Sequence, residues 1–185
     1  VRNAGRNVAG VIFNRANPGF DRDKAAAELD GVPIWGVVET NPALSAPRTI
    51  DVARHLNAEI MIEGEIATRR MVQTVLAARS VPEVISRLKH GTLVVTAGDR
   101  DDVILATALA ASNGIELAGL LLTHHSFISP RIERLGSHAF HSGLPVLRTD
   151  GDSYETAARI SRLPLAVPLD DLSRMDQVIE SVAEQ

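Results

Sequence analysis

The 185-residue sequence contains no cysteine. This absence excludes disulfide bonds, thiolate nucleophiles and zinc sites built from cysteine. It agrees with a reducing compartment, and we therefore expect a cytoplasmic protein. Aromatic residues make up only 3% of the chain, so aliphatic residues carry most of the 45% apolar share. That mixture favours a sheet covered by helices over an all-β sandwich.

Long apolar runs and an excess of positive charge are also missing. No apolar run approaches the ~20 residues that a bilayer-spanning helix needs. The formal net charge is −4, which provides no electrostatic footprint for nucleic acid. We therefore expect neither a membrane nor a nucleic acid as a partner. The chain begins with Val1 and enters a strand pattern almost at once, so we expect it to be truncated there or to begin at an unusual start codon.

Apolar runs alternate with helical stretches along the whole sequence. The predicted strands cover 8–13, 33–38, 58–62, 71–78, 93–95, 117–122 and 145–147, and the predicted helices 21–29, 48–56, 82–88, 101–113, 130–140, 153–163 and 172–183. Apolar strands that alternate with helices are typical of a parallel sheet covered on both faces. We therefore predict an α/β protein: a layered α/β/α fold with a mainly parallel central sheet, preceded by a short N-terminal β-α-β unit.

Two features refine this fold prediction. The helix over 101–113 is apolar nearly all round, including Leu109, so we expect it to be deeply buried and to end at a left-handed Gly114. Asn41-Pro42 and Ala46-Pro47 interrupt the pattern, which places a domain boundary near residue 43.

In open parallel sheets, ligands bind beyond the carboxyl ends of the strands. Three such ends are readable here, and they share one edge if their strands are neighbours. The ligand-binding residues that this rule predicts are Gly98, Asp99, Arg100, Thr123, His124, His125, Thr149 and Asp150.

The segment around Arg100 has two interpretations. In the first, Asp99 caps the following helix and Asp102, three residues later, completes a capping box. In the second, Arg100 presents its guanidinium to an anion. Three carboxylates at the same helix start would repel a phosphate, which favours the capping interpretation.

The histidines raise the question of a metal centre. His124, His125, His138 and His141 could form one with nearby carboxylates, or they could be surface and helix-end residues. No metalloprotease-type spacing is present, so we predict no metal site. There is also no phosphate-binding loop and no nucleophile elbow, and isolated carboxylates such as Asp152 are weak candidates for a general base. We therefore predict no catalytic residue.

Several segments together carry a resemblance to a known family. They include Gly98 to Val103, Ala110 to Gly114, Leu120 to Thr123, Thr49 to Ala58 and Val167 to Asp171. This set resembles the DRTGG domain, and most closely that of the long bacterial phosphate acetyltransferases. The resemblance covers residues 44 to the end.

The resemblance implies three regions. Residues 1–43 look like the C-terminal remnant of a dethiobiotin-synthetase-like domain, 44–165 like the DRTGG domain, and 166–185 like a linker toward an absent catalytic domain. In the first region, Asn14 matches an asparagine at which that domain reads a nucleotide base. The phosphate-binding part would lie upstream of this sequence, which favours the alternative that Asn14 is a turn residue at the end of the strand over 8–13. The family's Thr-Gly-Gly turn is here Thr123-His124-His125. Glycine adopts left-handed backbone without steric cost, so we expect the histidines to adopt it less readily and to weaken a ligand role of this loop.

The resemblance also implies a function. We expect a non-catalytic regulatory and assembly region of a phosphate acetyltransferase, whose parent enzyme transfers acetyl between coenzyme A and phosphate. The chain itself would hold no cofactor; its partners would be copies of itself, the catalytic domain and metabolite effectors. The alternative is an autonomous sensor that binds a nucleotide or organic acid at the carboxyl edge of the sheet, and a third interpretation is a histidine-metal hydrolase.

Overall fold

The computed structural model describes residues 8–40, 45–164 and 166–183. The chain divides into two compact units, one formed by Ala46–Leu165 and the other by Val1–Ser45 together with Ala166–Gln185. The boundary predicted near residue 43 lies among residues 41–44, outside the described part. Within the described residues, no helix combines the length and the apolar character needed to cross a membrane.

The larger unit contains a five-stranded sheet in the order β3-β7-β6-β5-β4. Its strands are β3 (Glu59–Ile62), β4 (Gln73–Leu76), β5 (Thr92–Ala97), β6 (Gly119–Thr123) and β7 (Val146–Arg148). The pairs from β4 to β7 are parallel, so the predicted mainly parallel sheet is confirmed. The edge strand β3 runs antiparallel to β7. These two strands are not consecutive in the chain, so no crossover connection imposes a parallel direction on them.

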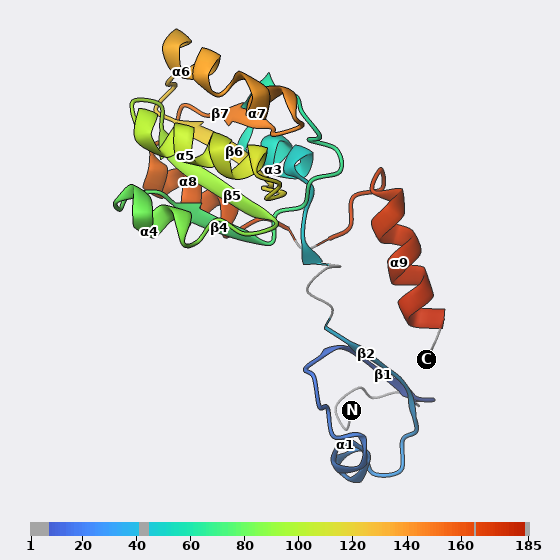
Figure 1. Cartoon of the computed structure of the whole chain (residues 1–185). Helices are drawn as coiled ribbons and strands as arrows, with labels where there is room; N and C mark the ends of the chain where they lie inside the picture. The colour runs from blue at the N-terminus through green and yellow to red at the C-terminus, as the bar shows by residue number, and fades with distance from the viewer. Residues whose placement is uncertain (1–7, 41–44, 165, 184–185) are drawn as a thin grey trace. The chain divides into compact units, whose positions relative to one another are not determined.

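Helices cover both faces of this sheet (Figure 1). Helices α3 (Thr49–Leu56) and α8 (Ser153–Ile160) pack on one face, and α4 (Val81–Ile85), α5 (Asp101–Ser112), α6 (Pro130–Leu135) and α7 (Ser137–His141) on the other. Successive strand residues alternate between the two cores: Leu120 and Leu122 belong to the α5 side, and Leu121 to the α3 side. This alternation produces the predicted α/β/α layers.

Some sequence predictions for the helices are wrong. In α5, Val103 and Ile104 are fully buried but Leu109 is 62% exposed, because an outer helix of a layered fold keeps one side in solvent. Gly114 closes α5 with φ +86°, as predicted. The helix expected over 130–140 is two helices, separated at Gly136, where an added Cβ would lie 2.7 Å from the ring of Phe140.

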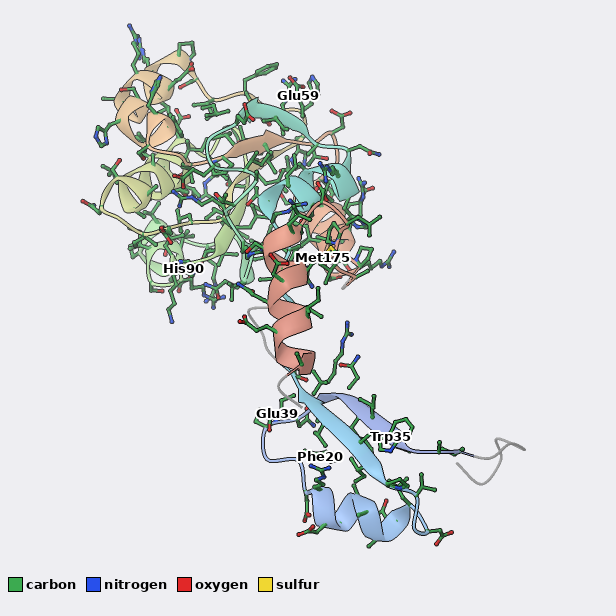
Figure 2. The ribbon with its side chains drawn as sticks, turned by 90° about the vertical axis from the view of Figure 1, so that its right-hand side faces the viewer. Phe20, Trp35, Glu39, Glu59, His90 and Met175 are labelled. Atoms are coloured by element: carbon green, nitrogen blue, oxygen red, sulfur yellow. The ribbon has the colours of Figure 1, made fainter. Side chains whose placement is uncertain are left out.

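The smaller unit contains β1 (Val11–Ala16), α1 (Arg22–Glu28), β2 (Ile34–Glu39) and α9 (Leu172–Ala183). Strands β1 and β2 pair in parallel. Asp21 begins α1 as predicted, since its carboxylate accepts a hydrogen bond from the Lys24 amide (2.9 Å). No residue of α1 is buried, and Trp35 on β2 is 60% exposed (Figure 2). A two-stranded sheet with so little burial is marginally stable.

Strand β1 differs from its predicted bounds. It begins at Val11 and continues past Asn14, which was expected to end it. Arg15 has φ +59°, and the register with β2 shifts between Asn14 and Ala16. Asn14 therefore precedes an irregularity inside the strand, and its side chain is exposed.

Candidate functional site

The loops that follow β6 and β7 are joined by backbone hydrogen bonds. The amide of His124 donates to the carbonyl of Gly151 (3.0 Å), and the amide of His125 donates to the carbonyl of Thr149 (2.9 Å). These bonds join the two loops directly beyond the ends of the paired strands. The loops containing the predicted residues Thr123 to His125 and Thr149 to Asp150 are thus brought together.

The loop that follows β5 packs against the same region. An added Cβ on Gly98 would lie closer than 3.0 Å to the Cβ of Ser126 and 3.2 Å from the amide nitrogen of Phe127. Only a residue without a side chain allows this approach. The prediction that the three strand ends share one edge of the sheet is therefore confirmed.

The turn Thr123-His124-His125 differs from the expectation for its backbone. His124 has φ +60° and His125 has φ +52°, so both histidines adopt left-handed backbone. The expectation that they would not readily do so is wrong, because the two interstrand hydrogen bonds of their amides hold the turn in this shape. The histidines thereby follow the left-handed path that two glycines would take.

Hydroxyl groups gather beneath this turn. The Thr123 hydroxyl, which is fully buried, lies 2.8 Å from the Ser153 hydroxyl and 3.0 Å from Nδ1 of His124. The Ser126 hydroxyl donates to the carbonyl of Thr123 (2.8 Å). The His125 ring pairs with the exposed carboxylate of Asp150. Buried hydroxyl groups thus hold the turn on its protein side, and the imidazole of His125 and the carboxylate of Asp150 lie on its solvent side.

Arg100 is engaged by its own surroundings. Its Nε–H and Nη2–H groups donate to the two carboxylate oxygens of Asp102 (2.9 and 3.0 Å), and further N–H groups donate to the carbonyls of Ala77 and Arg79 (both 3.2 Å). The hydrogen bond from Arg100 lowers the pKa of the Asp102 carboxyl, and the same bond raises the pKa of Arg100. This geometry does not support the anion-binding alternative for Arg100.

The predicted cap of α5 is wrong. The N-cap residue is Arg100 rather than Asp99, and its side chain makes no capping hydrogen bond to a backbone amide of the first turn. The carboxylate of Asp102 instead accepts two hydrogen bonds from the guanidinium, a bidentate pair between opposite charges. Asp152, in contrast, is the N-cap of α8 and accepts a hydrogen bond from the Glu155 amide (2.7 Å).

The remaining histidines lie apart from the turn after β6. His138 and His141 are in the short helix α7, and Nδ1 of His141 lies 2.6 Å from the carbonyl oxygen of Ser137. Within the described part of the chain, no three residues of the types His, Cys, Asp and Glu gather closely enough to hold a metal ion.

The DRTGG domain family matches residues 51–163. The chain belongs to this family. Over its whole length it is also similar to the phosphate acetyltransferase of Deinococcus radiodurans, with 42% identity. The phosphate acetyltransferases of Escherichia coli and Pseudomonas putida are 37% and 45% identical over 96% and 95% of the chain. The chain spans only 28%, 28% and 27% of the length of these three relatives.

A solved structure has a similar fold. It contains the CBS and DRTGG domains of the regulatory region of Clostridium perfringens pyrophosphatase, complexed with its activator, diadenosine tetraphosphate. The TM-score is 0.52 with 20% identity, over 88% of this chain and 70% of that one. The likeness agrees with the mixed α/β architecture described above.

Arg148, at the carboxyl edge of the DRTGG domain, was not predicted as a site residue from the sequence. Arg148, the last residue of β7, is buried, ion-paired with Glu59 of β3, and covered by the ring of Phe127, whose centroid lies 4.0 Å from the guanidinium carbon. The detectable signal was an arginine that directly continues the apolar run of a central strand. Charged residues are rarely buried unless they are paired or functional.

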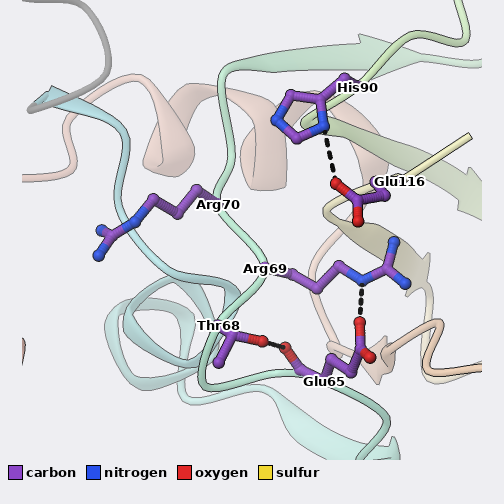
Figure 3. A pocket seen from close by; sticks show the side chains of 6 residues that line it. All are labelled: Glu65, Thr68, Arg69, Arg70, His90 and Glu116. Atoms are coloured by element: carbon purple, nitrogen blue, oxygen red, sulfur yellow. Dashed lines mark hydrogen bonds and ion pairs between the residues drawn. The ribbon is translucent and has the colours of Figure 1, made fainter. Parts of the chain in front are cut away.

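Two hollows lie away from this edge. One of about 250 Å³ lies near the amino ends of the parallel strands and is lined by Arg69, Arg70, His90 and Glu116, together with Glu65 and Thr68 (Figure 3). Its charges are largely paired within it: Arg69 with Glu65 (2.9 Å) and His90 with Glu116 (3.2 Å). The other, of about 360 Å³, lies between β3 and helices α6 and α7. Neither contains a ligand-binding residue predicted from the sequence, although His141, considered above as a metal ligand, lines the second.

Proposed function

We propose that this chain is a non-catalytic regulatory and assembly region of a phosphate acetyltransferase. The observation that carries the proposal is the similarity to these enzymes over the whole chain, of which the DRTGG domain forms the larger part. The parent protein would convert acetyl-CoA and phosphate into acetyl phosphate and coenzyme A, and coenzyme A would be its substrate rather than a cofactor of this region. We place the protein in the cytoplasm and expect it to assemble with copies of itself.

We also propose that the chain consists of three regions. Residues 1–43 would be the remnant of a dethiobiotin-synthetase-like domain in which Asn14 lies near a nucleotide base, and 44–165 the DRTGG domain. Residues 166–185 would lead toward the catalytic domain. In the β-α-β unit Trp35 is exposed and α1 has no buried residue. This is the structure expected of part of a larger domain.

The decisive experiment is an assay for acetyl phosphate formation by the purified 185-residue chain. We expect no turnover above buffer with acetyl-CoA and phosphate, and turnover by a full-length relative measured in parallel. Turnover that co-purifies with the chain through two independent columns would contradict the proposal.

A second candidate function is that of a small-molecule sensor. It is favoured by the polar turn from Thr123 to Ser126, which unites three loops at the edge where parallel sheets bind ligands. The solved DRTGG-containing region of the clostridial pyrophosphatase was obtained with a nucleotide activator, so a nucleotide is one reasonable ligand class. Calorimetric titration with ATP, NADH, pyruvate and coenzyme A tests this function, and the absence of heat with all four would remove it.

A further inference from the structure

Two buried polar groups at the carboxyl edge of the sheet are not satisfied by the protein. The side chain of Arg148 is only 7% exposed. One of its terminal nitrogens, Nη2, pairs with Glu59, but Nε and Nη1 have no hydrogen-bond partner among the described residues. The hydroxyl of Thr96 is also buried without a partner there. Buried polar atoms are almost always paired in proteins, so each exception needs a physical reason.

These two groups belong to one row across the sheet. Thr96 of β5 pairs in register with Leu122 of β6, and Leu122 pairs with Arg148 of β7. Residues in register on neighbouring strands point to the same face, and Leu122 points to the core formed with α5, α6 and α7. Thr96 and Arg148 therefore lie on that face, about 10 Å apart, the distance of two strand spacings.

The segment Ser126 to Ile128 covers this row. At one end Ser126 and the backbone of Phe127 pack against Gly98, next to the end of β5. In the middle the ring of Phe127 stacks over the guanidinium of Arg148, and at the other end Ile128 is buried in the core. The segment thus bridges the strand ends that flank the two unsatisfied groups.

Over the guanidinium of Arg148, this cover consists of one aromatic ring. The side chain of Phe127 is 61% exposed, so it can move aside while losing little buried surface. Its neighbour at the edge is the ring of His125, which meets it edge-on with centroids 5.9 Å apart. A ring that shields a buried cation and is itself open to solvent is suited to exchange with a ligand.

We propose that Arg148 binds the anionic group of a small metabolite, a carboxylate or a phosphate, after the ring of Phe127 moves aside. The unsatisfied Nη1 end of the guanidinium donates to the oxygens of the anion, while Glu59 keeps its bond to Nη2. The hydroxyl of Thr96 lies about 10 Å away, so only a longer ligand such as ATP, and not phosphate, acetate or pyruvate, would reach it as well. The inference rests on the sensor function proposed above and identifies the residue that recognises the ligand.

Calorimetric titrations of the 185-residue chain test this site. The ligands are inorganic phosphate, ATP, acetate and pyruvate, so that the first two report a phosphate group and the last two a carboxylate. Arg148→Met keeps a long buried side chain but removes the donors, and we expect it to weaken binding by at least about tenfold. Arg162→Met removes the same charge from an exposed position after α8 and should bind as the wild type does.

A variant of the cover provides an independent readout. Phe127→Ala removes the ring that competes for the guanidinium, and we expect it to tighten binding by about two- to fivefold, the equivalent of one exposed cation–π contact. If Arg148→Met does not fold, as judged by circular dichroism, Arg148→Lys replaces it. Lysine keeps the charge but loses the planar fork, so binding should again weaken.

The outcomes separate the site from the function. Unchanged binding in a folded Arg148 variant would overturn the site and leave the sensor function standing. The absence of binding by all four anions would overturn the site, and the sensor function would then be decided by the titrations with NADH and coenzyme A. Neither result bears on the role as a non-catalytic region of a phosphate acetyltransferase, which the turnover assay decides. A crystal structure at saturating concentration of an anion that binds in the titrations, with only a water molecule on Nη1, would also overturn the site.

Discussion

The start of helix α3 offers a sharp test of how the larger unit is stabilised. Asp51 accepts hydrogen bonds from the backbone amide of Arg48 (3.0 Å) and from its Nε and Nη2 groups (3.0 and 2.9 Å). Both residues are buried. Asp51→Ala would remove these hydrogen bonds to the amide and guanidinium of Arg48, and the buried guanidinium would lose this carboxylate. Breaking a buried ion pair in this way costs about 3–5 kcal/mol.

The expected loss is large relative to the stability of a domain. Unfolding free energies are typically about 5–15 kcal/mol. With a urea m-value of roughly 2 kcal/mol per molar, a loss of about 4 kcal/mol lowers the unfolding midpoint by about 2 M. Urea titrations followed by far-ultraviolet circular dichroism measure this shift. Asp101→Ala is the matched control, because Asp101 is an exposed carboxylate in the first turn of α5, and its loss should cost less than about 1 kcal/mol.

A double variant separates the contribution of the ion pair from the penalty of removing only its carboxylate. Arg48→Met combined with Asp51→Leu replaces the ion pair by apolar groups of similar volume, and such replacements are often neutral. We expect the double variant to recover more than half of the stability lost in Asp51→Ala. A loss of less than about 1 kcal/mol of unfolding free energy in Asp51→Ala would contradict this prediction, and so would a double variant that is as unstable as Asp51→Ala.

Three further predictions concern other parts of the chain. Gly98→Ala should lower the free energy of unfolding by about 1–3 kcal/mol in the same urea assay, because the added Cβ would overlap a neighbouring side chain. Gly151→Ala is the control: its added Cβ has a nearest contact of 3.3 Å, so the loss should be smaller, and equal losses would contradict this prediction. Arg100 lowers the pKa of Asp102, so their ion pair stabilises the fold above the unfolded value of 3.8 and loses this effect as pH falls below it. The stability difference between the wild type and Asp102→Asn, under about 1 kcal/mol for this exposed pair, should therefore be present near pH 6 and decrease as the pH falls below 3.8 and through the lowered pKa of Asp102; a difference that does not decrease in acid would refute it. The fluorescence of Trp35, the only tryptophan, should show an unfolding transition at a lower urea concentration than circular dichroism does, because the smaller unit is less stable than the larger one. Transitions at the same urea concentration would contradict this difference in stability.

The order and kind of the elements were predictable because they depend on local patterns. Runs such as Leu120 to Leu122 are apolar on both sides, which only a strand buried on both faces requires. The exposure of Leu109 was not predictable in the same way, because an apolar residue on an outer helix has the same sequence signature whether or not a neighbour covers it. The antiparallel direction of β3 depends on which strand it meets, and that partner is 84 residues or more away in sequence.

The candidate site shows the same division. The rule for strand ends correctly brought the loops after β5, β6 and β7 together, because parallel strands end at one edge. It did not identify the partners of Arg100, two of which are backbone carbonyls from the distant residues Ala77 and Arg79. Backbone groups carry no sequence signature, so their role appears only when the chain is folded.

The sequence by itself determined the α/β architecture, the kinship with the DRTGG domain and the location of the carboxyl edge. Each of these rests on residues that are close together in the chain or on a recognisable set of motifs. Only the tertiary structure decided that His124 and His125 take left-handed backbone, because hydrogen bonds from the loop after β7 hold them. It also decided that Arg148 is buried beneath Phe127 with donors unsatisfied, because burial is a property of packing between segments that no local pattern records.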